Sequence, residues 1–143
     1  MTDKSLETKL RLISLQQESW KKLHDLITYG LDKAKPIISA EQERIFTEVR
    51  SGLLQETEYV LGKLGMLNEL SGRAMNVLQR GSSLRAVREF TSDEHRRLEA
   101  DWNGVFTKLG TVQGQLKARR KALSEQTFIS YWATRILRQQ AAT

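Results

Sequence analysis

Apolar residues recur along this chain at helical spacing in three long stretches. In the first, from about residue 5 to residue 33, a row of positions alternates in steps of four and three: Leu6, Leu10, Ile13, Gln17, Trp20, His24, Ile27 and Leu31. Such a heptad seam indicates a helix that packs lengthwise against other helices. The helix should end before Lys35, because the residue before a proline, here Pro36, avoids the helical conformation.

The second stretch predicts a helix from about residue 40 to residue 79. Ser39 and Gln42 have the spacing of a capping box, in which each side chain bonds to the backbone of the other residue. The expected core side consists of Ile45, Phe46, Val49, Leu53, Val60, Leu64, Leu67, Ala74 and Leu78. Gly62 and Gly65 weaken this helix and mark either a bend or a close helix crossing.

The third stretch follows a connector over residues 80–91, in which residues 84–90 form either a helical turn or an irregular segment. Thr91 and Glu94 make a second capping box, which predicts a helix over about residues 92–138. Its seam again has four-three spacing: Leu98, Trp102, Val105, Leu109, Val112, Leu116, Arg119 and Leu123. Trp20 and Trp102 lie in phase with their seams, so we expect both in the core.

No stretch of the sequence alternates with the period of a β-strand. The predicted fold is therefore all-α: one helical domain over residues 1–143, built as an elongated antiparallel three-helix bundle or coiled coil. The apolar runs are too short for a membrane span, and the first residues do not resemble a signal peptide. With no cysteine in the chain, we expect a cytoplasmic protein.

Catalytic and metal-binding motifs are missing from the sequence. Its two histidines, His24 and His95, are not preceded by a glutamate three residues earlier, and no zinc or phosphate-loop motif occurs. We therefore expect no enzyme activity, no cofactor and no metal. His24 on the first seam is either a pH-sensitive or register-setting contact, or a polar residue at the edge of the bundle.

The positive charge is concentrated near the end of the chain. The net charge is +6, and residues 80–143 hold twelve basic and six acidic groups, which is also a net +6. Lys117, Arg119, Arg120 and Lys121 form a candidate basic cluster, which could bind phosphates. However, a helix spreads these residues around its circumference, which favours a solvated stretch that faces the acidic second helix.

A second apolar stripe begins after Leu123. Phe128, Trp132 and Ile136 recur every four residues, so they share one face of the helix. The step from Leu123 to Phe128 rotates this stripe by about 140° away from the seam at 100° per residue. Two interpretations stay open. Either the helix bends near Ser124 and the stripe closes the bundle end beside Ile37, Ile38, Ile45 and Phe46, or the stripe is exposed and binds a partner's helix.

The chain resembles the FlgN-type flagellar export chaperones in outline. The likeness consists of three long helices in about 140 residues, the absence of cysteine, and an amphipathic last helix from Leu109 through Gln113, Leu116, Leu123 and Phe128 to Leu137. It implies a protein that binds the helical C-terminal segments of hook-associated proteins and keeps them exportable.

Three functional hypotheses follow. The first is a non-enzymatic export chaperone or adaptor that binds a partner's helical segment along the third helix, with Phe128, Trp132, Ile136, Leu116 and Leu123 as candidate binding residues. The second is a structural scaffold or self-associating coiled coil, which would form homo-oligomers. The third is a basic bundle that binds nucleic acid through the cluster at residues 117–121.

Overall fold

The computed structural model describes residues 4–142, with side chains through Gln139; residues 1–3 and 143 of the predicted domain lie outside the described residues. Its helices are α1 (Lys4–Leu31), α2 (Ala40–Lys63), α3 (Leu67–Arg80), α4 (Leu84–Arg88) and α5 (Ser92–Ala142). No strand occurs among the described residues, so the all-α prediction is confirmed. Of the two alternatives for residues 84–90, the helical one holds over Leu84–Arg88, which form the short helix α4.

The prediction of three helices is wrong, because the expected second helix is divided into α2 and α3. The break lies at Gly65, whose φ of 74° is in the left-handed region that favours glycine. The Met66 amide donates to the Leu61 carbonyl at 2.8 Å, and the Gly65 amide donates to Gly62 at 3.2 Å. These bonds close the turn and send α3 back along α2. Of the two glycines expected to mark a bend, Gly65 makes the turn.

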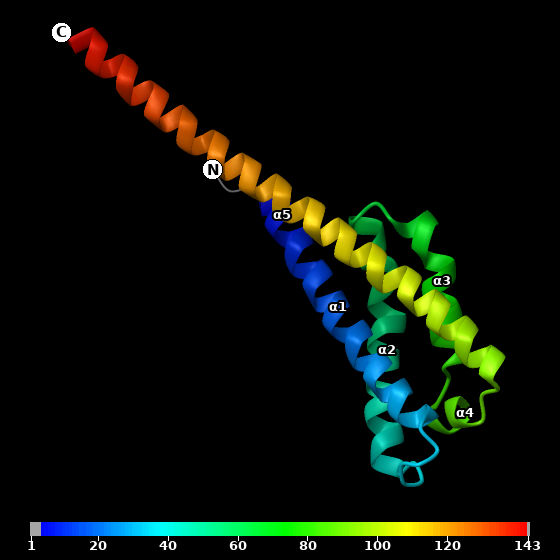
Figure 1. Ribbon diagram of the computed structural model, residues 1–143. Helices are drawn as coiled ribbons and strands as arrows, with labels where there is room; N and C mark the ends of the chain where they lie inside the picture. Colours follow the sequence, from blue (N-terminus) through cyan, green and yellow to red (C-terminus); the bar gives the residue numbers. More distant parts are fainter. Residues whose placement is uncertain (1–3, 143) are drawn as a thin grey trace.

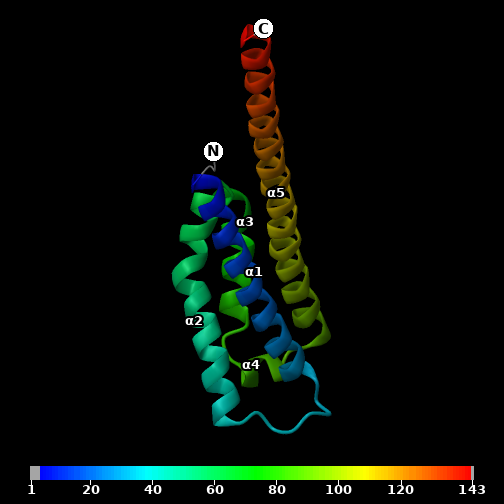
Figure 2. The same ribbon diagram turned by 90° about the vertical axis from the view of Figure 1, so that its left-hand side faces the viewer.

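This additional turn reverses the direction of the last helix. The Trp102 indole donates to the Trp20 backbone carbonyl at 2.9 Å, and the Gln113 side-chain amide donates to the Ser14 hydroxyl at 3.0 Å. Later residues of α5 therefore pair with earlier residues of α1, so the two helices are antiparallel. In a simple three-helix bundle they would be parallel. Figures 1 and 2 show that α5 begins at the end of the bundle where α1 finishes.

One core joins all five helices. Its fully buried large side chains include Trp20, Phe46, Ile13, Leu23, Ile27, Leu53, Leu61, Leu78, Leu84, Leu98 and Leu109. Trp102 is also buried, so the prediction that Trp20 and Trp102 fill the core is confirmed.

In α1 the buried row departs from the four-three count, because Gln16 and Leu23 are buried where Gln17 and His24 were expected. The Gln16 side-chain oxygen Oε1 accepts a hydrogen bond from the Trp20 indole at 2.8 Å and one from the buried Thr57 hydroxyl at 3.4 Å, so each of these buried side chains has a partner.

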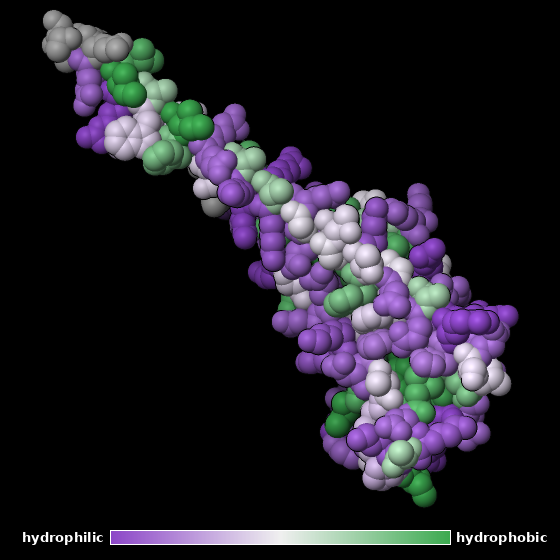
Figure 3. Space-filling model, viewed as in Figure 1, coloured by the Kyte–Doolittle hydropathy of each residue, from purple (hydrophilic) through white to green (hydrophobic). Residues whose placement is uncertain are grey.

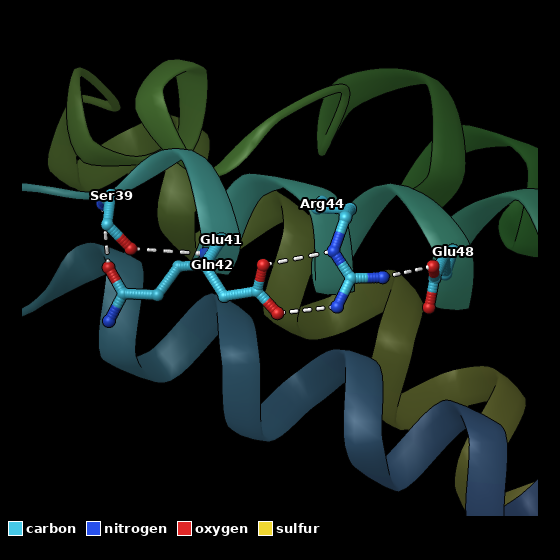
Figure 4. A network of polar contacts seen from close by, with 5 residues as sticks. All are labelled: Ser39, Glu41, Gln42, Arg44 and Glu48. Atoms are coloured by element: carbon cyan, nitrogen blue, oxygen red, sulfur yellow. Dashed lines mark hydrogen bonds and ion pairs between the residues drawn. The ribbon is translucent and has the colours of Figure 1, made fainter.

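The capping box at Ser39 is present as predicted. The Gln42 amide donates to the Ser39 hydroxyl at 3.2 Å, and the Ser39 amide donates to the Gln42 side chain at 2.9 Å (Figure 4). One turn later Arg44 bridges Glu41 and Glu48 on the solvent side of α2 (Figure 4). The hydrogen bonds from Arg44 lower the pKa of the Glu41 carboxyl below its ordinary value.

The short helix α4 closes the end of the bundle where α5 begins. The Glu43 carboxylate of α2 accepts from the backbone amides of Leu84, at 3.3 Å, and Arg85, at 2.7 Å. The Arg88 guanidinium donates to the Gly30 carbonyl at 2.9 Å and to the Pro36 carbonyl at 2.8 Å. Glu43 thus pairs the free amides at the start of α4, and Arg88 pairs a free carbonyl in the last turn of α1 and one in the loop that follows.

We predict opposite effects for alanine at the two neighbouring glycines. Gly65→Ala should lower the free energy of unfolding by about 1 to 2 kcal/mol, because a Cβ is strained in the left-handed conformation. Gly62→Ala is the matched control: a Cβ there meets no atom within 4 Å, and alanine should stabilise the helix by up to about 1 kcal/mol. Urea denaturation measures both. If both variants gain stability, residues 40–80 form one continuous helix and the turn at Gly65 is wrong.

Candidate protein-binding surface

The last helix is longer than the helices that cover it. Near the start of α1, Arg120 of α5 lies 3.7 Å from the Glu7 carboxylate, and α1 begins only three residues before Glu7. Beyond this point no other described helix lies beside α5 (Figures 1 and 2). Every side chain of residues 124–139 is exposed, and we call this segment the α5 extension.

The aromatic stripe lies on this extension. The exposed fractions are 63% for Phe128, 43% for Trp132 and 50% for Ile136. The Phe128 and Trp132 rings meet edge to face, with their centroids 6.0 Å apart. Figure 3 shows green, hydrophobic side chains along the projecting part of α5 among purple, hydrophilic ones. The stripe is therefore a solvent-facing surface of this chain.

The interpretation in which the helix bends near Ser124 and closes the bundle is wrong. The helix α5 is continuous from Ser92 to Ala142. The expected apolar partners also lie at the other end of the bundle, next to the start of α2, where Ile38 and Phe46 are buried and Ile37 is 89% exposed. The reversed direction of α5 separates the stripe from that end.

An open groove lies at the base of the extension. Leu6 and Glu7 of α1 form one side, and the α5 side consists of Lys117, Arg120, Lys121, Leu123, Ser124, Glu125, Thr127, Phe128 and Tyr131. Leu123 is half-buried and borders this groove, whereas Leu116 is half-buried and packs against the core. Of the five candidate binding residues, Leu116 therefore serves mainly the bundle, and the other four belong to the groove or the extension.

The basic cluster is exposed at the junction of bundle and extension. Lys117, Arg120 and Lys121 border the groove, and Arg119 does not. Only Arg120 forms an ion pair with a described residue, and that residue is Glu7 of α1. The cluster is solvated as expected, but its expected position against the acidic second helix is wrong, because this part of α5 lies against α1.

His24 connects α1 to α5. Its Nε2 lies 2.8 Å from Glu99 Oε1, and His95 Nε2 lies 3.6 Å from the same oxygen. The His24 ring also packs against the Trp102 ring, with centroids 4.0 Å apart and the ring planes tilted by 30°. The histidine is thus an interhelical contact, with 26% of its side chain still exposed to solvent. In the part of the chain that the structure describes, no group of three His, Asp or Glu side chains could hold a metal ion.

Three large exposed apolar residues of the extension were not among the five candidate binding residues: Ile129, Tyr131 and Leu137, which are 66%, 61% and 65% exposed. Ile129 and Tyr131 widen the apolar surface on both sides of Trp132. The sequence carried the signal for Ile129, which lies only about 60° from Trp132 on a helical wheel.

No described helix combines the length and the apolar character that a membrane span requires.

No protein family model matches the chain, and no significantly similar curated protein or solved structure was found. The likeness to the FlgN-type chaperones therefore has no support from sequence or structural similarity.

We predict that amide hydrogen exchange separates the two parts of α5. Residues 98–112 pack on the core, whereas residues 124–139 make no hydrogen bond or ion pair to another helix among the described residues. A helix of about 16 residues without tertiary contacts is marginally stable in water, so the extension should exchange orders of magnitude faster. Mass spectrometry of exchanged peptides measures this. Equal protection in both segments would mean that another chain covers the extension.

Proposed function

We propose that this protein is a non-enzymatic binding protein that holds a helical segment of a partner along α5, in the manner of an export chaperone or adaptor. The observation that carries the proposal is the exposed stripe of Phe128, Trp132 and Ile136 on a helix that extends beyond its own bundle. Large aromatic side chains are the usual anchors of binding surfaces. An apolar stripe with four-residue spacing is typical of helix-to-helix recognition.

The size of the surface suits one partner helix. The extension of residues 124–139 is about 24 Å long at 1.5 Å per residue. A partner helix of about four turns would match that length. One end of such a helix could pack into the groove beside Leu6 and Leu123, where α1 begins. The partner would then take the place beside α5 that no described helix occupies.

A self-associating scaffold is the second candidate, because the same stripe could pair with the stripe of a second copy. Two copies would form a symmetric interface, in which the same patch contacts itself. Parallel pairing would bring the two basic clusters at residues 117–121 together, which opposes association. Light scattering at several concentrations separates the candidates, since a scaffold gives a stable higher assembly and a chaperone gives a monomer that binds other chains.

We predict that Trp132→Ala abolishes partner binding and leaves the fold intact. Trp132 is exposed, so its removal should change the free energy of unfolding by less than about 1 kcal/mol. By contrast, removal of a buried tryptophan such as Trp20 should cost about 3 to 5 kcal/mol. Thermal unfolding gives the stability, and affinity purification from a native lysate with mass spectrometry gives the partners.

Tyr59→Ala provides the matched control for the binding measurement. Tyr59 is 61% exposed on α2, and α2 does not border the groove or the extension. The proposal requires proteins that are retained by the parent and by Tyr59→Ala but not by Trp132→Ala. A Trp132→Ala variant that retains the same proteins, or that unfolds, would contradict the proposed role of the stripe.

A further inference from the structure

The part of α5 that offers the stripe carries nearly all of the chain's excess charge. Residues 117–139 contain six cations and one carboxylate: Lys117, Arg119, Arg120, Lys121, Arg135 and Arg138 against Glu125. Among the described residues only Arg120 has an ion-pair partner, Glu7 at 3.7 Å. The folded chain thus leaves five of these cations without a paired carboxylate in its described part.

Three of the cations lie on the same side of the helix as Phe128. At 100° per residue, Lys117, Lys121 and Arg135 each fall within about 20° of the direction of Phe128. Lys117 and Lys121 border the groove together with Phe128 and Tyr131, and the Arg135 guanidinium lies 5.4 Å from the centre of the Trp132 ring. A row of positive charge therefore follows the Phe128 edge of the stripe.

The opposite edge of the stripe carries no cation, and its one charged residue is a carboxylate: Glu125 falls within about 20° of the direction of Ile136. Beyond Ile129 the positions on that side are Ala122, Gln126 and Ala133. An amphipathic helix that lies in a membrane surface has a polar face rich in lysine and arginine opposite its apolar face. The one-sided arrangement on α5 favours instead a ligand with one charged edge, and a second amphipathic helix has that form.

We propose that the ligand of the extension is an acidic amphipathic helix of a partner protein. Its apolar face covers Phe128, Trp132 and Ile136, and carboxylates along one edge pair with Lys117, Lys121 and Arg135. This inference rests on the proposed function and adds the chemistry of the partner. Complementary charge across such an interface speeds the encounter and rejects helices with the opposite pattern, because like charges would be brought together as water is excluded.

The test uses the full chain and three dye-labelled synthetic helices of about 18 residues, long enough to match the extension. All three share one leucine-rich face, and they differ at one edge, which is glutamate, glutamine or lysine. Fluorescence anisotropy should show the glutamate peptide binding at least about tenfold more tightly than the lysine peptide. Its affinity should fall steeply between about 50 and 500 mM salt, since salt screens these charges.

Two charge-reversal variants identify the residues responsible. Lys117→Glu with Lys121→Glu should abolish or invert the preference for the glutamate peptide. Lys21→Glu with Lys22→Glu makes the same change of net charge at exposed positions of α1 and should leave the preference intact. Trp132→Ala should weaken binding of all three peptides.

The outcomes separate the two proposals. Equal affinity for all three peptides, lost in Trp132→Ala, would overturn the acidic partner and support helix binding. If the double variant Lys117→Glu with Lys121→Glu still prefers the glutamate peptide, these two lysines are not the cations that pair with the partner. Sedimentation with phosphatidylglycerol vesicles but not with phosphatidylcholine vesicles, without binding of any peptide, would overturn the inference in favour of an anionic membrane surface.

Discussion

The difference in length between α5 and the helices beside it governs the shape of this molecule. The helix α5 has 51 residues, whereas α1, its longest neighbour, has 28. A shorter neighbour can pack against only part of α5. The contact between α1 and α5 ends near the ion pair of Arg120 with Glu7. The backbone bonds of an α-helix lie within the helix itself, so α5 can continue into solvent without leaving buried polar groups unpaired.

The bundle fixes the position from which the extension projects. The Trp102 indole donates to the Trp20 carbonyl, His24 meets Glu99, and Gln113 donates to Ser14. These contacts set one register between α1 and α5 along most of α1, and the buried tryptophans make a shift costly. The groove at Leu6 and the basic residues near it consequently have fixed places relative to the stripe. The core thus acts as a rigid base for the surface that we propose to bind a partner.

Much of this architecture could be predicted from local sequence signals. The apolar periodicity, the capping box at Ser39 and the seam positions of Trp20 and Trp102 all gave correct expectations, because each depends on neighbouring residues. The division of the second helix was missed, since apolar positions continue on both sides of Gly65 and no proline stands there. A left-handed glycine is visible only in the folded backbone.

The candidate site depends on the missed turn. With three helices, the end of the last helix would lie beside Ile38 and Phe46, and a buried stripe would be reasonable. With α2 and α3 separate, the direction of α5 reverses and the stripe of Phe128 and Trp132 points into solvent. The phase step after Leu123 was correctly read from the sequence, but it could not distinguish a bend from an exposed face. That choice required the path of the whole chain.

Contact between the extension and a helix of another protein can be tested with a photo-crosslinking amino acid at Ile136. Leu54, on the exposed side of α2, is the control position. We expect a crosslink from Ile136 to one helical segment of a different protein that is rich in glutamate and aspartate, and no such product from Leu54. Crosslinks from Ile136 only to a second copy of this chain, or equally from both positions, would contradict this expectation.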